Sequence, residues 1–289
     1  MKPLWPGWPI LVDACAVAPL EWRESECTPE DIQHIEREAT NKSPFDPLQL
    51  RYTMWSRARL RQGVVMRVRE CALAKVIVFF ELDDGDPTPW EFWGRIFAAM
   101  GAPPPTPAKP RPHWRIVWFA ADSPRRFGPQ GSPIGPLHVN GGYAYPCEPG
   151  TVIVYRKEEG TRVLLHELLH AGCTDDHAKT TEQKESETET WAELFLIALL
   201  ANGDLSRARR LWDIQSKWII KQNMRLQKNH NVIGPNDYAW RYTVGREDVF
   251  RRLGLALPRV TSALPVNSLR FTAPELEPKS AAATKAVKK

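Results

Sequence analysis

The segment TRVLLHELLHAG, residues 161–172, limits the possible folds of this chain more than any other part of the sequence. Leucines on several sides predict a helix buried in a core, and Gly172 stands where such a helix ends. His166 and His170 are four residues apart, so they lie on one face of this helix, with Glu167 one position round. Two imidazoles and a carboxylate are costly to bury among leucines without a shared partner. The segment therefore predicts a bound metal ion.

The spacing H-E-x-x-H indicates a hydrolytic zinc site when it lies on a helix. It gives one ion two histidine ligands, here His166 and His170, and leaves a coordination position for water. Glu167 is expected to take a proton from that water as the water attacks a carbonyl group. Zn²⁺ is thus the predicted cofactor, and Glu167 is the predicted catalytic base.

Strand and helix patterns place this helix within a chain of mixed α and β structure. Four apolar runs of strand length precede it, and a capping box at Thr88 opens an amphipathic helix between the first two. A glutamate-rich helix that turns apolar and a basic amphipathic helix over about 205–228 follow it. We therefore expect an α+β fold. The expected strands cover residues 75–82, 113–120, 138–146 and 151–155.

In its H-E-L-L-H motif and in this order of elements, the chain resembles the zincin superfamily of metallopeptidases over roughly residues 75–200. The resemblance implies a zincin-like catalytic domain, with a mixed twisted sheet, a backing helix, the H-E-x-x-H helix and a second ligand-bearing helix. It also implies zinc-dependent hydrolysis of a peptide or protein substrate. The region around the helix is similar, too, to zincin-like proteins of large DNA viruses.

A catalytic zinc ion usually has three protein ligands, so a third one is needed. In the gluzincin branch it is a glutamate on a later helix, followed four residues on by an acid that orients a zinc-binding histidine. The segment ETWAE, residues 189–193, is similar to that pattern, with Glu in place of the usual Asp. This gluzincin-like resemblance makes Glu189 the third ligand, and Glu193 the acceptor for the free ring N–H of His166.

Three other residues compete for the third position. In the metzincin branch the motif continues with glycine and then with histidine or aspartate at a fixed spacing. Asp176 falls on that ligand position and His177 lies one beyond it, but Cys173 stands where the glycine belongs. Glu185, one turn before Glu189 on the same expected helix, is the remaining possibility.

The third expected strand contains the sequence Asn140, Gly141, Gly142 and Tyr143. In zincins this strand forms the edge of the cleft and pairs with extended substrate. Its two glycines would permit close approach of a substrate backbone. A tight hairpin without a functional role explains the same glycines equally well.

Three later residues are candidates to donate a hydrogen bond to the developing oxyanion, as later His or Tyr residues do in gluzincins. They are His230, Tyr238 and Tyr242. Tyrosines more often serve only to pack, so each of the three remains one alternative among several.

Charge is unevenly distributed along the chain. Residues 204–289 hold 17 Lys and Arg and 7 Asp and Glu, which leaves 22 and 27 upstream. We expect an N-terminal helical preface over 1–70, a metallopeptidase domain with C-terminal helices over 71–260, and a basic, disordered tail over 261–289. The basic part could attract nucleic acid weakly, although a solvated basic helix and tail explain it as well.

Cysteine usage and hydropathy bear on location. The five cysteines are odd in number and contain no C-x-x-C pair, so neither a disulfide framework nor a cysteine zinc finger is expected. A reducing, cytoplasmic or otherwise intracellular location fits this pattern best, with secretion the alternative. No run of about 18 apolar residues occurs, so we expect no membrane partner.

The sequence favours an intracellular zinc metallopeptidase. The first alternative is a zincin fold that binds or regulates without catalysis. The second is a protease recruited to nucleic acid by its basic C-terminal part.

Overall fold

The computed structural model describes residues 5–105, 113–258 and 268–280, and the chain divides into two compact units. One, here called the sheet unit, comprises residues 17–124, 141–174 and 278–289. The other, the helical unit, comprises residues 1–16, 125–140 and 175–277. The units interleave along the chain, whereas the sequence suggested consecutive segments over 1–70, 71–260 and 261–289. Packing of distant segments produces this division, and local patterns do not record it.

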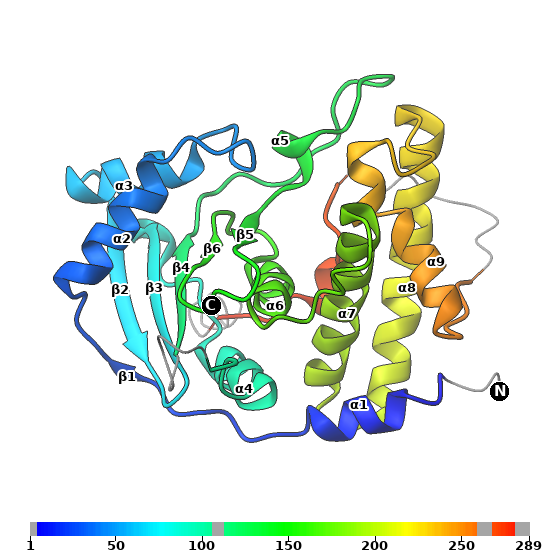
Figure 1. The fold of residues 1–289 in the computed structure, drawn as a ribbon, viewed down its shortest axis with the longest axis horizontal. Helices are drawn as coiled ribbons and strands as arrows, with labels where there is room; N and C mark the ends of the chain where they lie inside the picture. The colour runs from blue at the N-terminus through cyan, green and yellow to red at the C-terminus, as the bar shows by residue number, and fades with distance from the viewer. Residues whose placement is uncertain (1–4, 106–112, 259–267, 281–289) are drawn as a thin grey trace. The chain divides into compact units, whose positions relative to one another are not determined.

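The sheet unit is built on one mixed sheet of six strands (Figure 1). The sheet order is β1-β2-β3-β4-β6-β5, with β3, β4 and β6 parallel to one another. Strands β1, β2 and β5 pair antiparallel with their neighbours. The mixed α and β character is confirmed. The strands span Arg23–Glu24 (β1), Val64–Glu70 (β2), Ala74–Glu81 (β3), Trp114–Phe119 (β4), Gly142–Ala144 (β5) and Val152–Val154 (β6).

Two of these strands correct the expectation that residues 1–70 are a helical preface. The run VVMRVRE of β2 pairs antiparallel along its whole length with β3, from Val64 opposite Glu81 to Glu70 opposite Lys75. The short strand β1 adds to the outer edge of β2. The region does contain helices, including α2 (Pro29–Thr40) and α3 (Leu50–Arg59).

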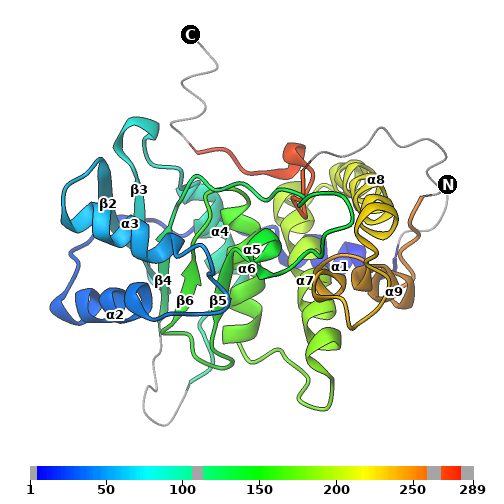
Figure 2. The ribbon, with the colours of Figure 1, turned by 90° about the horizontal axis from the view of Figure 1, so that it is seen from above.

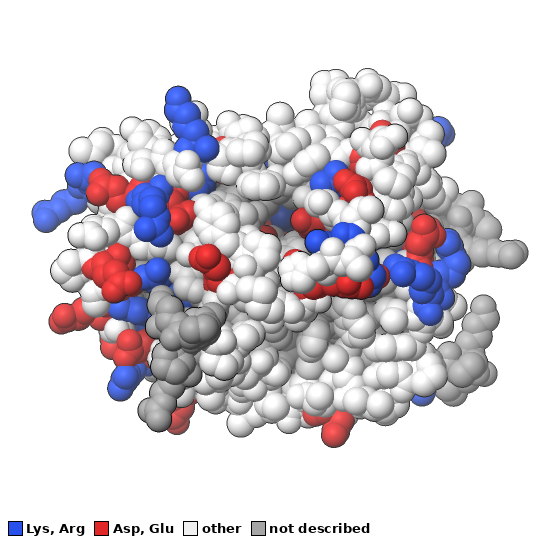
Figure 3. All heavy atoms as spheres, in the orientation of Figure 1, with Lys and Arg blue, Asp and Glu red and all other residues white. Residues whose placement is uncertain are grey.

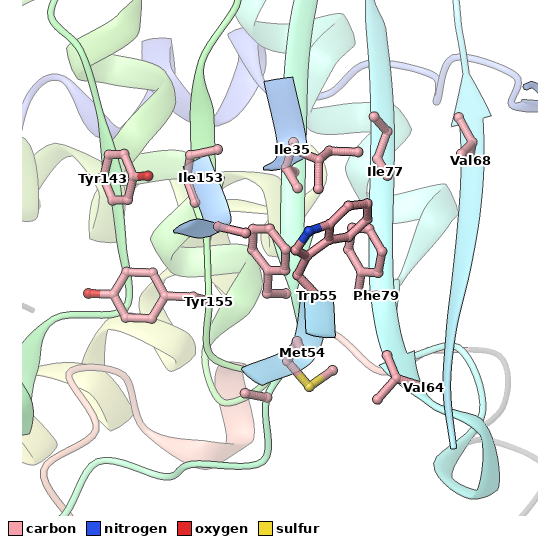
Figure 4. Packing of buried hydrophobic residues seen from close by; sticks show 14 residues of the cluster. Ile35, Met54, Trp55, Val64, Val68, Ile77, Phe79, Tyr143, Ile153 and Tyr155 are labelled. Carbon is pink, nitrogen blue, oxygen red and sulfur yellow. The ribbon is translucent and has the colours of Figure 1, made fainter. Parts of the chain in front are cut away.

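Helices α2 and α3 cover one face of the sheet. On the face of the molecule drawn in Figure 3, acidic and basic side chains are interspersed over this region. Their inner side contributes Ile35 and Trp55 to a buried cluster with Ile77 and Phe79 of β3 and Ile153 of β6 (Figure 4). Since side chains alternate along a strand, the neighbouring strand residues point to the opposite face.

That opposite face is covered by α4 (Trp90–Met100) and α6 (Gly160–Ala171), which carries the H-E-L-L-H motif (Figure 2). Trp93 of α4 packs on Trp118 of β4 with ring centroids 5.1 Å apart, and its indole N–H donates to Thr161 Oγ1 at 2.9 Å. The predicted capping role of Thr88 is wrong, because Pro89 is the N-cap residue and no side chain caps α4.

The helical unit consists mainly of α7 (Thr181–Ala201) and α8 (Leu205–His230). Both begin at side-chain caps: Thr180 and Gln183 form a capping box on α7, and the Asp204 carboxylate accepts from two amides at the start of α8. Shorter elements complete the unit: α1 (Trp8–Ala14), α5 (Pro136–Val139), α9 (Gly245–Arg252), and 3-10 turns η2 (Tyr238–Tyr242) and η3 (Pro274–Leu276). A further 3-10 turn of the sheet unit, η1, spans Leu82–Asp84.

Two sequence expectations about irregular segments need correction. The strand expected over 138–146 is shorter, because Pro136 opens the helical turn α5 and only Gly142–Ala144 pairs as a strand. The tail expected to be disordered is ordered over 268–280. Its Leu269 and Phe271 belong to a buried cluster of the helical unit. Residues 261–267 and 281–289 of that tail lie outside the described residues.

The ordered C-terminal segment is held through its backbone. The Gln215 side chain of α8 donates to the Phe271 carbonyl and accepts from the Ala273 amide, both at 2.8 Å. Trp218 Nε1 donates to the carbonyl of Arg270 at 2.8 Å. Hydrogen bonds to backbone groups tolerate many side chains, so the sequence of this segment does not predict its docking.

Candidate metal centre

Helix α6 carries the candidate ligands of the sheet unit. All of its residues from Gly160 to Ala171 are buried. Gly160 is required at its start, because a Cβ there would lie 2.5 Å from the Trp118 ring. The predicted helix and its end at Gly172 are confirmed.

His166 and His170 present their rings to the same point. Their side chains come from adjacent turns, and their Nε2 atoms are 3.1 Å apart. Two nitrogen ligands of a tetrahedral zinc ion, each about 2.05 Å from the metal, are separated by roughly 3.3 Å. The two imidazoles therefore fit adjacent positions around one ion.

Glu167 lies where α6 meets the edge strand β5. A Cβ built on Gly142 of β5 would be 3.0 Å from Glu167 Oε1 and 2.6 Å from Val163 Cγ1. Glycine is what allows the backbone of β5 to come this close to the helix. The predicted general base and the predicted substrate-pairing strand are thus neighbours in the same unit.

A disulfide joins the turn after β5 to the end of α6, beside His170. The cysteine pattern had predicted no disulfide framework. Cys147, in the turn after β5, is bonded to Cys173, just beyond α6. The amides of both cysteines donate to the carbonyl of His170, at 3.1 and 3.2 Å. The cysteines are 26 residues apart and form no recognisable motif, so only the fold brings them together.

Tyr143 has a different position from the one expected of a substrate-contacting residue. Its side chain is buried on the α2 and α3 side of the sheet, where its hydroxyl donates to Glu38 Oε2 at 2.9 Å. The Arg51 guanidinium donates to the same hydroxyl at 2.5 Å. Burial raises the pKa of Tyr143 far above its ordinary value, against the effect of Arg51. The side chain of Tyr143 therefore anchors β5, and Asn140 and Gly141 precede the strand.

In the helical unit, the three candidate acids Glu185, Glu189 and Glu193 follow one another at four-residue intervals on α7. They therefore occupy one face of the helix. Glu189 and Glu193 are buried, at 3% and 0% exposure, and Glu185 is half-buried.

Glu193 has a partner that the sequence did not indicate. The Arg246 guanidinium of α9 lies 3.5 Å from Glu193 Oε2, and both side chains are fully buried. Thr272 Oγ1 donates to the same carboxylate oxygen at 3.4 Å. Glu193 therefore neutralises a buried cation of the helical unit, which is a structural role additional to the one predicted for it.

Two of the three oxyanion candidates lie together. The Tyr238 hydroxyl donates to Asn140 Oδ1 at 3.0 Å and is 3.5 Å from the Tyr242 hydroxyl. Burial, followed by the nearby Glu185 carboxylate, raises the pKa of Tyr242 well above its ordinary value. Its hydroxyl is therefore protonated at neutral pH and able to donate.

The third oxyanion candidate, His230, is occupied elsewhere in the helical unit. Its Nδ1 lies 3.0 Å from the Ser132 carbonyl, and its ring stacks on Phe127 with centroids 5.4 Å apart. The alternative ligands Asp176 and His177 are exposed, and Asp176 lies 3.5 Å from the ammonium group of Lys179.

No protein-family model, curated protein or solved structure matches this chain. Across residues 5–105, 113–258 and 268–280, no helix combines the length and the apolar character that crossing a bilayer requires.

Proposed function

We propose that this protein is a zinc-dependent peptide hydrolase. The observation that carries the proposal is the pair of His166 and His170 Nε2 atoms, 3.1 Å apart, on a helix whose Glu167 lies against the edge strand β5. Two ligands, a base and a strand that can pair with an extended peptide are the parts that such a reaction needs.

In this proposal a zinc ion, when bound, supplies Lewis-acid polarisation of the scissile carbonyl and lowers the pKa of water. Glu167 accepts the proton of the attacking water and passes it to the leaving amine. The backbone of β5 aligns the substrate beside Glu167 through main-chain hydrogen bonds. Tyr242, whose hydroxyl is protonated at neutral pH, is the favoured donor to the oxyanion, with Tyr238 as the alternative.

We infer that α7 supplies the third ligand, with Glu189 favoured and Glu185 as the alternative. Both glutamates occupy the same face of α7, and Glu189 is the more buried. The gluzincin-like pattern ETWAE, residues 189–193, is what favours Glu189. Glu193 is less suited to bind zinc, because its carboxylate lies 3.5 Å from the Arg246 guanidinium.

Zinc content after dialysis against a weak chelator distinguishes the two. Glu189→Ala should lose zinc while Glu185→Ala retains it, and Asp176→Ala should match the wild type. The reverse result for the first two variants would transfer the ligand role to Glu185. Loss of zinc in Asp176→Ala alone would reject α7 as the source.

Glu167→Gln tests the catalytic assignment. The variant should keep its zinc and its melting temperature, but lose hydrolysis of a peptide library by a factor of at least about 100. Glu148→Gln, at an exposed residue of the same unit, is the matched control and should keep full activity.

Equal cleavage by Glu167→Gln and wild type would reject Glu167 as the base. Full wild-type activity after exhaustive chelation would reject the metal. A zinc-loaded wild type that cleaves no peptide would favour the non-catalytic binding role instead.

A further inference from the structure

Helix α8 has two different faces. Its inner face packs within the helical unit through buried residues such as Trp212, Ile219 and Leu226. Its outer face consists of residues that recur every three or four positions and therefore share one side of the helix. All of them are exposed except Lys221, which is half-buried. They are Arg207, Arg210, Ile214, Lys217, Lys221, Met224 and Lys228.

This outer face, called the basic face below, carries five cations and no acid among its seven residues. Two acids border it: Asp204 caps the start of the helix beside Arg207, and the Asp213 carboxylate lies 2.6 Å from Lys217 Nζ. Both side chains of that pair are more than half exposed, so the pair contributes little stability, and its one acid offsets only one of the five cations. Over α2 and α3, by contrast, both signs of charge are mixed (Figure 3).

The dimensions of the basic face match a polyanion with regularly spaced charges. From residue 207 to residue 228 the helix rises by about 31 Å, at roughly 1.5 Å per residue. One turn of duplex DNA is about 34 Å long, and its phosphates follow one another along the whole of that length.

The residue types on the basic face favour the backbone of a duplex over other nucleic-acid features. The face offers no aromatic side chain, whereas single-strand binding relies on rings that stack with bases. It offers no Asn or Gln to pair with adenine edges. Lysine and arginine side chains alone supply phosphate contacts, which carry no sequence information.

We propose that the basic face of α8 binds the phosphate backbone of duplex nucleic acid without sequence preference. The proposal concerns the helical unit alone and does not depend on the peptidase function. A protease with this face would be concentrated on nucleic acid and on proteins bound there.

Fluorescence anisotropy with a labelled 20-base-pair DNA duplex tests the proposal on the full chain. Five phosphate contacts predict a slope of about −4.5 for log K against log salt between 50 and 200 mM. The variant R207Q/R210Q/K217Q/K221Q should bind at least about 100-fold more weakly at 50 mM salt, with a slope near −1. Two duplexes of unrelated sequence should bind equally.

The matched control is R37Q/K42Q/R59Q/R61Q, which removes the same charge from exposed positions on and beside α2 and α3. It should bind like the wild type, and both variants should keep the wild-type melting temperature. Equal weakening by the two variants would reduce the effect to net charge and overturn the proposal. Tighter binding to vesicles rich in anionic lipid than to the duplex would overturn it in favour of a membrane surface.

Discussion

Replacing Gly142 by alanine probes the contact between β5 and α6 on which the candidate site depends. The new Cβ would lie 2.6 Å from Val163 Cγ1, 2.7 Å from the Ile153 carbonyl oxygen and 3.0 Å from Glu167 Oε1. Carbon atoms pack best at about 3.5–4.0 Å, so at least two of these distances must increase. Val163 and Glu167 can rotate, but the Ile153 carbonyl belongs to the β6 backbone.

Overpacking of this kind costs about 1–3 kcal/mol of the free energy of unfolding. At about 2–4 °C per kcal/mol, the melting temperature should fall by roughly 2–12 °C. If β5 moves away from α6 by about 1 Å, peptide hydrolysis should fall on the order of 100-fold, because the substrate then lies farther from Glu167. Zinc content should not change, since the atoms nearest to the new Cβ belong to Val163, Ile153 and Glu167 and not to the histidines.

Gly135→Ala is the matched control. Among the described residues, apart from its two chain neighbours, no atom lies within 4 Å of a Cβ at Gly135, and its φ of −116° suits any residue. Differential scanning calorimetry of both variants measures the difference directly. If Gly142→Ala had the same melting temperature as Gly135→Ala and the wild type, β5 could not lie against α6 as described.

Two further predictions concern contacts that join distant parts of the chain. Phe271→Ala should lower the free energy of unfolding by about 3–5 kcal/mol, because Phe271 is 2% exposed and stacks near Tyr242. Chemical denaturation measures this, and Ile233→Ala is the control because Ile233 is 66% exposed. Equal stability of the two variants would show that the C-terminal segment is not packed in the core. Cys147→Ser should cost about 3.5 kcal/mol under oxidising conditions, from the loop that the disulfide closes. The difference from wild type should vanish in excess dithiothreitol, and its persistence there would show that side-chain packing is responsible.

The elements around the candidate site could be predicted because their signals are local. The run KVIVFFEL indicates a buried strand by its β-branched and aromatic residues, and β3 spans Ala74–Glu81. The leucines of TRVLLHELLHAG predict a core helix, and α6 spans Gly160–Ala171. Within that helix, four-residue spacing alone places His166 and His170 on one face.

Signals that depend on distant residues could not be read in the same way. Nothing near Glu193 indicates that Arg246, 53 residues later, lies beside its carboxylate. Likewise, a strand pattern does not predict which face of β5 is packed against which helix. Only the packing of α2 and α3 places the Tyr143 hydroxyl beside Glu38 and Arg51. The low hydropathy of the C-terminal end predicted disorder, but Gln215 and Trp218 hold its backbone.

The sequence by itself determined the helix of the H-E-L-L-H motif and the strand runs before it. It also determined the glutamate-rich helix and the basic helix after it. These follow from periodicity, which each segment carries within a few residues. Only the tertiary structure decided that Gly142 lies against Glu167, that Cys147 meets Cys173, and that the basic residues of α8 share an outer face while its apolar ones are buried. The physical reason is that such contacts depend on which surfaces bury one another, and the free energy of burial belongs to the packed chain as a whole.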